Sequence, residues 1–206
     1  MARLPGRSQE HPLTSFAAAA GSLAALTAVG LLCAADACAQ PAPGAETRLV
    51  AVAGARLGPL AGRTSVLPGG ALLLRLTPRV ALGGGGWASR SPVELDRSGT
   101  ALSFGYGGVV LRVTRTRRAP VFFGWQLLLG AGSAVIRDTA VGVELDADNV
   151  IVAEPAVAAH VPLLDRVDLS ASAGWRFTGG VDRAAGLDAS DLGGWMLGLS
   201  LALAFL

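Results

Sequence analysis

The sequence predicts an all-β protein, an eight-stranded antiparallel up-and-down transmembrane β-barrel. Three observations predict it: a terminal segment with strict two-residue periodicity, strand-like segments that recur along the chain, and connections that alternate in length. From Trp195 to Phe205, large apolar side chains alternate with small ones such as Gly198 and Ala202. Because successive residues of a strand point to opposite faces, this segment has a bulky apolar face and a small face. Such a strand suits a barrel whose outside meets lipid and whose inside is narrow.

The first part of the chain has the pattern of a cleavable secretory signal. Arg3 and Arg7 precede an apolar run from Phe16 to Ala35, which leads to Ala37-Cys38-Ala39. A positive start, an apolar centre and a small-x-small site define such a leader. A membrane-spanning helix is the alternative, because about twenty apolar residues could cross a bilayer. The expected organisation is a signal over 1–39, a short periplasmic segment over 40–46 and the barrel over 47–206.

Eight strand-like segments follow the leader. No helical periodicity of useful length competes with them. Glycine is abundant in these segments, which fits close-packed faces and bends in a barrel. The expected strands are Thr47–Leu57, Gly69–Leu76, Arg79–Ala88, Thr100–Val113, Pro120–Ile136, Asn149–Val161, Val167–Phe177 and Gly193–Leu206.

The connections between these strands alternate in length. The short ones are Thr77-Pro78, Thr114–Ala119 and Pro162–Arg166. Alternating short and long connections on an even number of strands are typical of bacterial outer-membrane barrels, whose short turns face the periplasm. We therefore expect an outer-membrane location with both termini periplasmic. The longer connections are Gly58–Pro68, Ser89–Gly99, Arg137–Asp148 and Thr178–Leu192. They carry most of the acidic residues, which suits contact with lipopolysaccharide through divalent cations.

Alternation also assigns side chains to lipid or to the lumen. In Val121–Gly130 and Val167–Phe177 one parity is wholly apolar and the other holds most of the polar or small residues, whereas a soluble barrel would invert this pattern. In Thr100–Val113 the apolar parity changes at Gly107-Gly108, which predicts a β-bulge. Aromatic rings favour the headgroup region, and Trp87 is placed with the outer set. The expected interfacial aromatics are Phe122, Phe123, Trp175, Phe177, Trp195 and Phe205.

Charged residues on the inner parity form an expected lumen polar cluster. An unpaired charge in a narrow lumen is costly, so these groups should form ion pairs and hydrogen bonds. Glu154 and Arg176 lie on neighbouring strands at similar distances from the Pro162–Arg166 turn, and we expect them to pair. The inward-facing set is Arg48, Arg56, Arg75, Arg112, Glu154, Asp168 and Arg176, together with His160.

The sequence predicts no catalytic residue, cofactor or metal. His160 is the one histidine after the leader; it shares its inward side with Ser170 and Ser172, for which a structural hydrogen bond is preferred over catalysis. The acidic segment Glu144–Asn149 lacks the glycine and the distal glutamate of a calcium loop. The net charge of +2 is too balanced to indicate nucleic-acid binding.

Several short segments of the second half carry a family resemblance. They are Gly105–Gly108, Gly124–Gly132, Ala153-Glu154-Pro155, Gly174–Phe177 and Asp188–Gly194. With the terminal strand, they resemble a family of small exported bacterial outer-membrane β-barrel proteins, largely uncharacterised in function. The resemblance covers roughly Leu102 to Leu206 and implies fold and location rather than an activity. Many members end in phenylalanine, and Phe205 one place earlier implies recognition by the barrel-assembly machinery.

The expected function is therefore non-enzymatic. We expect an integral, monomeric outer-membrane barrel with a structural or surface-interaction role, in contact with outer-membrane lipid and lipopolysaccharide and without a nucleic-acid partner. A first alternative is a narrow conduit or binder for small solutes, with anions favoured because the inferred lumen holds five arginines against two acids. A second alternative is a lipid-modifying outer-membrane enzyme.

Overall fold

The computed structural model of the chain contains two units, Met1–Pro43 and Gly44–Leu206. It describes residues 48–95, 99–115, 120–180 and 187–205, all of them in the second unit. The expected signal and the periplasmic segment lie outside the described residues, so both stay predictions.

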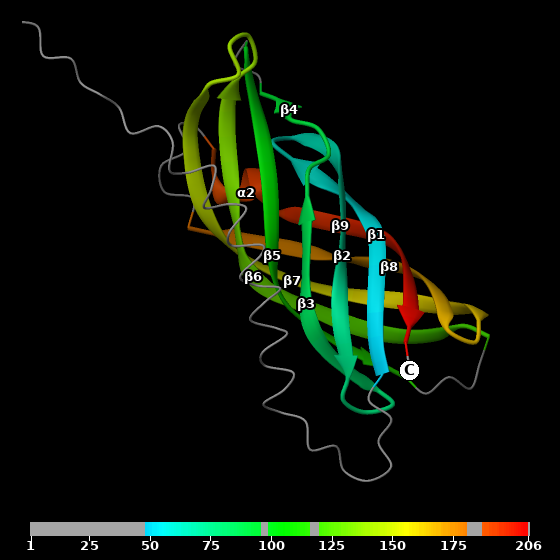
Figure 1. Ribbon diagram of the computed structural model, residues 1–206. Coiled ribbons are helices and arrows are strands. Elements are labelled where there is room, and N and C mark those ends of the chain that lie inside the picture. Colours follow the sequence, from blue (N-terminus) through cyan, green and yellow to red (C-terminus); the bar gives the residue numbers. More distant parts are fainter. Residues whose placement is uncertain (1–47, 96–98, 116–119, 181–186, 206) are drawn as a thin grey trace, which may run out of the picture. The chain divides into compact units, whose positions relative to one another are not determined.

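Eight strands form a closed antiparallel ring (Figure 1). Their order is β3-β2-β1-β9-β8-β7-β6-β5, and β3 also pairs with β5, which closes the ring. A two-residue strand, β4, pairs with β5 beyond the end of β3. The predicted eight-stranded antiparallel architecture is confirmed. The strands are β1 (Arg48–Leu60), β2 (Arg63–Arg75), β3 (Val80–Ala88), β4 (Val93–Glu94), β5 (Thr100–Thr114), β6 (Phe122–Asp138), β7 (Glu144–Leu164), β8 (Val167–Gly179) and β9 (Gly194–Ala204).

Burial alternates along the strands as the sequence predicts. In β6 the buried Gln126 and Leu128 alternate with the exposed Trp125 and Leu129. The same alternation runs through β8 and β9, whose apolar parity faces outward. Side chains of the inner parity fill the ring with one core of mostly apolar residues, interrupted by a small number of buried polar groups.

The expected long connection between the first two strands is wrong. Residues Gly58–Leu60 and Arg63–Pro68 continue β1 and β2, and a two-residue turn, Ala61-Gly62, joins them. Both turn residues have positive φ, 49° and 75°, as in the hairpin turns whose twist matches that of paired strands.

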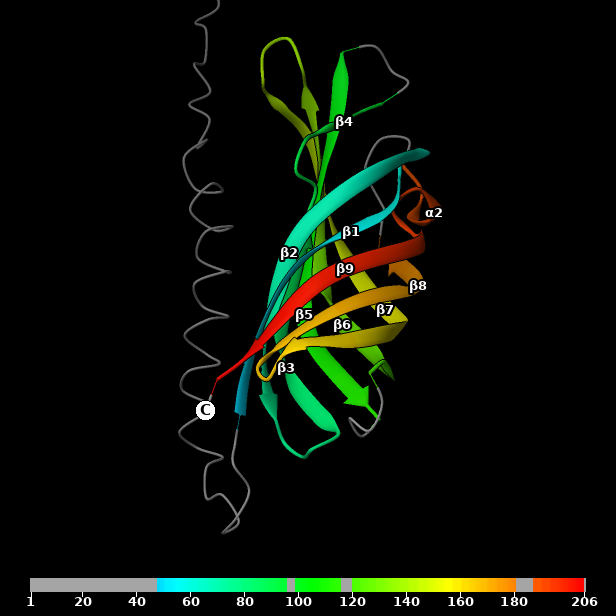
Figure 2. The ribbon, with the colours of Figure 1, turned by 90° about the vertical axis from the view of Figure 1, so that its right-hand side faces the viewer.

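The longest hairpin extends beyond the rest of the ring. β6 runs to Asp138 and β7 starts at Glu144, so most of the expected Arg137–Asp148 loop is strand. β8 pairs with β7 only from Ile151 onward, so the first residues of β7 extend beyond the end of β8. We call this end of the ring, where β8 stops, the rim. Figures 1 and 2 show this hairpin and the adjoining end of β5 standing past the other strand ends.

β5 contains no bulge, contrary to the prediction. Its pairs with β3 and β6 run without a shift, and one parity faces inward throughout. Phe104 and Tyr106 are therefore buried in the lumen together with Val110, whereas Val109 is exposed. The apolar parity changes in the sequence because the large apolar residues before Gly107, including Phe104 and Tyr106, face the lumen opposite small outward residues, whereas Val109 after it faces outward.

One short helix, α2 (Ala189–Leu192), lies in the connection between β8 and β9. It contacts β8 and β1, and the amide of Ala61 donates to the carbonyl of Asp191 at 2.7 Å. Leu192 is fully buried against the core. Within the described ranges, no helix is long and apolar enough to cross a membrane.

Candidate functional site in the barrel lumen

An arginine–glutamate pair is buried in the lumen. Arg56 and Glu154 are only 4% and 1% exposed, and Arg56 Nη1 lies 2.5 Å from Glu154 Oε2. The same nitrogen donates to the Tyr106 hydroxyl at 3.1 Å. The guanidinium carbon of Arg56 lies 3.3 Å from the centre of the Trp87 ring, a cation–π contact. We call Arg56, Trp87, Tyr106, Glu154 and Arg176 the lumen cluster.

Arg176 completes this cluster from β8. It is 1% exposed, and its Nη2 donates to the Pro59 carbonyl at 3.4 Å. Its guanidinium carbon lies 5.3 Å from the Phe104 ring and 5.6 Å from the Tyr106 ring. Among the described residues, three buried atoms of the cluster find no hydrogen-bond partner: Arg176 Nε, Arg176 Nη1 and Glu154 Oε1.

The expected pairing of Glu154 with Arg176 is wrong. The strand pairs Ala153–Phe177 and Ala156–Gly174 bracket these two residues, so they do lie opposite each other on β7 and β8. The carboxylate nevertheless bonds to Arg56, which reaches it across the lumen from β1. Cross-strand position places the two groups side by side, but the direction of each side chain decides the pair.

The remaining residues of the expected set lie on other inward-facing positions of the ring. Arg112, half-buried on β5, donates from Nη2 to Gln126 Oε1 at 3.4 Å. Arg75 and Asp168 are half-buried on inward-facing positions of β2 and β8. For Arg48 the structure describes the backbone alone, paired with Arg75.

His160 and the serines lie near the turn between β7 and β8. His160 is buried, and its ring stacks on Phe122 with centres 5.0 Å apart. Ser170, opposite His160 on β8, shares a 2.8 Å hydrogen bond with Ser200. Among the described residues, no three histidine, cysteine, aspartate or glutamate side chains gather closely enough to hold a metal.

The aromatic residues divide between the outer surface and the lumen. Trp175 and Trp195 are exposed and face each other across β8 and β9, next to the exposed Phe177. Phe123 and Phe205 are exposed at the opposite end of the ring. Two expectations are wrong: Phe122 and Trp87 are buried, at 7% and 8% exposure. Each lies on the inner parity of its strand, where it stacks on His160 or on Arg56, respectively.

Sequence reasoning missed the aromatic part of the lumen cluster. Tyr106 shares its parity with Leu102 and Phe104, and an unbroken period of two through β5 would have placed it inward. Trp87 follows the run Gly83–Gly86, which has no side chains from which to read a phase. The register of β3 with β5 supplies that phase, because Trp87 pairs directly with Tyr106.

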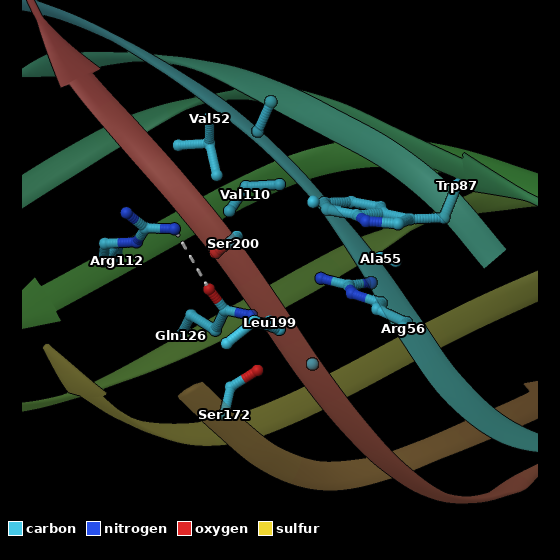
Figure 3. Close-up of a pocket in the computed structure, with 13 residues that line it drawn as sticks. Val52, Ala55, Arg56, Trp87, Val110, Arg112, Gln126, Ser172, Leu199 and Ser200 are labelled. Carbon is cyan, nitrogen blue, oxygen red and sulfur yellow. Dashed lines mark hydrogen bonds between the residues drawn. The ribbon is translucent and has the colours of Figure 1, made fainter. Parts of the chain in front are cut away.

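A small cavity lies beside the cluster (Figure 3). Its volume is about 20 Å³, which is room for a water molecule or two. Buried side chains pack the described lumen around it, as is usual for eight strands. The polar side chains lining the cavity are Arg56, Arg112, Gln126, Ser172 and Ser200.

A closed eight-stranded ring with an apolar outside and a side-chain-filled inside defines a small up-and-down β-barrel of the outer-membrane type. Among solved structures, this chain is similar to the N-terminal β-barrel domain of Pseudomonas aeruginosa OprF, with a TM-score of 0.52 and 14% identity over 77% of this chain and 97% of that one. It is similar also to Neisserial surface protein A, with a TM-score of 0.55 and 13% identity over 77% and 96%. No known sequence family and no curated protein matches the chain. The likeness is therefore one of fold.

Proposed function

We propose that this protein is an integral outer-membrane barrel with a structural or surface-interaction role and no catalytic activity. One observation carries the proposal: every strand of the ring has large apolar side chains exposed on its outer face. Soluble monomers rarely expose contiguous apolar surface on this scale, whereas a lipid-facing belt with aromatic residues near both edges requires it. We propose contact with outer-membrane lipid on the same ground, and a monomeric state.

A charge placed within the belt tests the proposal. Leu199 is exposed in the middle of β9, and Leu145 is similarly exposed on the hairpin above the rim. In lipid vesicles, Leu199→Arg should lower folding stability by about 2–4 kcal/mol, the cost of arginine near the bilayer midplane. Leu145→Arg, the matched control, should leave stability unchanged. Equal effects of the two substitutions, or recovery of the protein in the soluble periplasmic fraction, would contradict a lipid-facing belt.

The hairpin of β6 and β7 supports a surface-interaction role. Val141 at its tip is 70% exposed, and Val143 and Leu145 are also exposed beyond the rim. Acidic groups accompany them, including Asp138 and the exposed Glu144. With the short β7–β8 turn in the periplasm, this hairpin would stand outside the cell, where it could contact lipopolysaccharide through divalent cations.

Cysteine labelling in whole cells tests this orientation. Both cysteines of the chain, Cys33 and Cys38, lie within the expected signal, so an introduced cysteine would be unique in the mature protein. Val141→Cys should react with a membrane-impermeant maleimide on intact cells. Leu163→Cys, exposed beside the β7–β8 turn, should react only after the outer membrane is permeabilised. The proposed orientation has both chain ends in the periplasm. The reverse labelling pattern would overturn that orientation without contradicting the barrel fold.

The two alternatives make different predictions. A conduit would give steady conductance in a planar bilayer, whereas the filled lumen predicts none. A lipid-modifying enzyme would change the mass spectrum of lipid A when the protein is expressed. We expect neither change, and we expect the barrel-assembly machinery to recognise β9 and Phe205 as the insertion signal.

A further inference from the structure

Around Glu154, arginines outnumber acids on the inward-facing positions of the described ring. The arginines are Arg56, Arg75, Arg112 and Arg176, against Glu154 and Asp168; a further inward-facing acid, Asp148, is buried near the start of β7. Because a buried charge is costly without a partner, a surplus of guanidinium groups favours a counter-ion or strong hydrogen-bond acceptors inside the ring.

The cavity of Figure 3 lies where this surplus is concentrated. Arg56 and Arg112 approach it from opposite sides, and no carboxylate is among its lining residues. Glu154 is already bonded to Arg56 through Oε2, and Asp168 stands two inward positions away from Ser172 on β8. Two cationic groups and two serine hydroxyls therefore border a space without an acidic side chain.

Arg112 has hydrogen-bonding capacity that the protein does not use. Within the described part of the chain, its guanidinium makes one long hydrogen bond, 3.4 Å from Nη2 to Gln126 Oε1, and its buried Nε has no partner. A planar guanidinium offers five N–H donors, so an acceptor in the cavity would meet several of them at once. Two residues keep the space open: Gly54 and Gly198 line it without side chains, and a Cβ on Gly198 would lie 2.5 Å from Ser172 Oγ.

We propose that this cavity binds one small monovalent anion of the halide class, held by Arg56, Arg112 and the neighbouring hydroxyls. The size of the cavity admits a monatomic ion and excludes larger organic anions. An anion would place negative charge between the two guanidinium groups and accept from both. It would stabilise the folded ring, because the site is assembled only when β1, β5, β6, β8 and β9 come together.

The first test measures stability in detergent micelles at fixed ionic strength. Unfolding is followed in sodium chloride, sodium bromide and sodium gluconate, whose anion is too large for the cavity. Chloride and bromide should shift the folding equilibrium saturably, by about tenfold once the ion is at ten times its Kd. Arg112→Met should abolish this shift, and Arg63→Met, at an exposed position, should retain it. Equal stability in chloride and gluconate would overturn the proposal.

A second measurement does not depend on whether the variant folds. Crystals of the wild-type protein grown in bromide should show an anomalous scattering peak between Arg56 and Arg112. Water density in that position without an anomalous peak would overturn the proposal. Neither test depends on the membrane location. The anion site can therefore be refuted while the outer-membrane assignment stands, and the outer-membrane assignment can be refuted while the anion site stands.

Discussion

Replacing Glu154 by glutamine tests the packing of the lumen directly. The substitution keeps the size of the side chain and removes the charge that faces Arg56 at 2.5 Å. Arg56 then remains buried as a cation without a carboxylate. Breaking a buried ion pair by removing one partner costs about 3–5 kcal/mol. We expect the lower end, about 3 kcal/mol, because the amide oxygen can still accept a hydrogen bond and the contacts of Arg56 with Tyr106 and Trp87 persist.

The same substitution on the outside of the ring provides a matched control. Glu94 lies 3.8 Å from Arg63, and their side chains are 78% and 51% exposed. Exposed pairs contribute about 0–1 kcal/mol, so Glu94→Gln should be close to neutral. Any general effect of replacing glutamate by glutamine appears equally in both variants, and the difference between them isolates burial.

The assay is reversible unfolding by urea in lipid vesicles, followed by tryptophan fluorescence and by the heat-modifiable mobility of the folded barrel on gels. A Glu154→Gln variant within about 1 kcal/mol of the wild type would refute the reasoning. The double variant Arg56→Met with Glu154→Leu offers a further check. It should recover much of the lost stability, because an apolar pair of similar volume replaces a buried ion pair at little cost.

Three further predictions concern the pairing of β1 with β9 and the aromatic residues. Gly54→Ala should lower folding stability by about 1–3 kcal/mol in urea titrations, because its Cβ would meet the Leu199 carbonyl oxygen; Gly179→Ala, with open space around it, should be neutral. In single-tryptophan variants, brominated lipids should quench the exposed Trp175 strongly, and comparable quenching of Trp87 would contradict its place in the lumen. Trp87→Leu should destabilise the ring by about 1–2 kcal/mol through loss of its cation–π contact with a desolvated guanidinium, and a neutral result in the same titration would refute that contact.

The sequence predicts the ring where the two faces of a strand differ. In β8 and β9 apolar side chains lie outside and mostly polar or small ones inside, so the period of two also assigns the faces. In β5 the apolar side chains before Gly107, Phe104 and Tyr106, face inward, and Val109 after it faces outward. Periodicity alone treats this switch as a shift of the strand, and the expected bulge came from it.

Proline misled the reading of the first hairpin. Pro59 and Pro68 resemble loop residues, yet they pair within β1 and β2 with Thr64 and Ala55. The pairing of β1 with β9 ends at Leu57, before Pro59, and that of β2 with β3 starts at Gly69, after Pro68. A missing N–H group is tolerated where a strand has only one neighbour, and a sequence does not show how far each neighbour extends.

The candidate site was predicted as a set of residues and not as a network. Parity alone placed Arg56, Glu154 and Arg176 inward, and all three are buried there. The choice of partner depends on distances across the lumen, which join β1 to β7 and are set by the closed ring. Such contacts between strands that are not neighbours have no signature in the local pattern.

The pairing of β1 with β9 has a consequence for how the protein is made. This seam joins the first and last strands of the ring over the pairs from Val50–Ala204 to Leu57–Leu197. Contacts so distant along the chain form late, because much of the chain must be ordered before the ends meet. A partly synthesised chain therefore has two unpaired strand edges, with exposed N–H and C=O groups that favour aggregation. We therefore expect the chain to need a chaperone until its last strand has been synthesised. Truncation of β9 should yield a chain that proteases degrade, and not a smaller barrel.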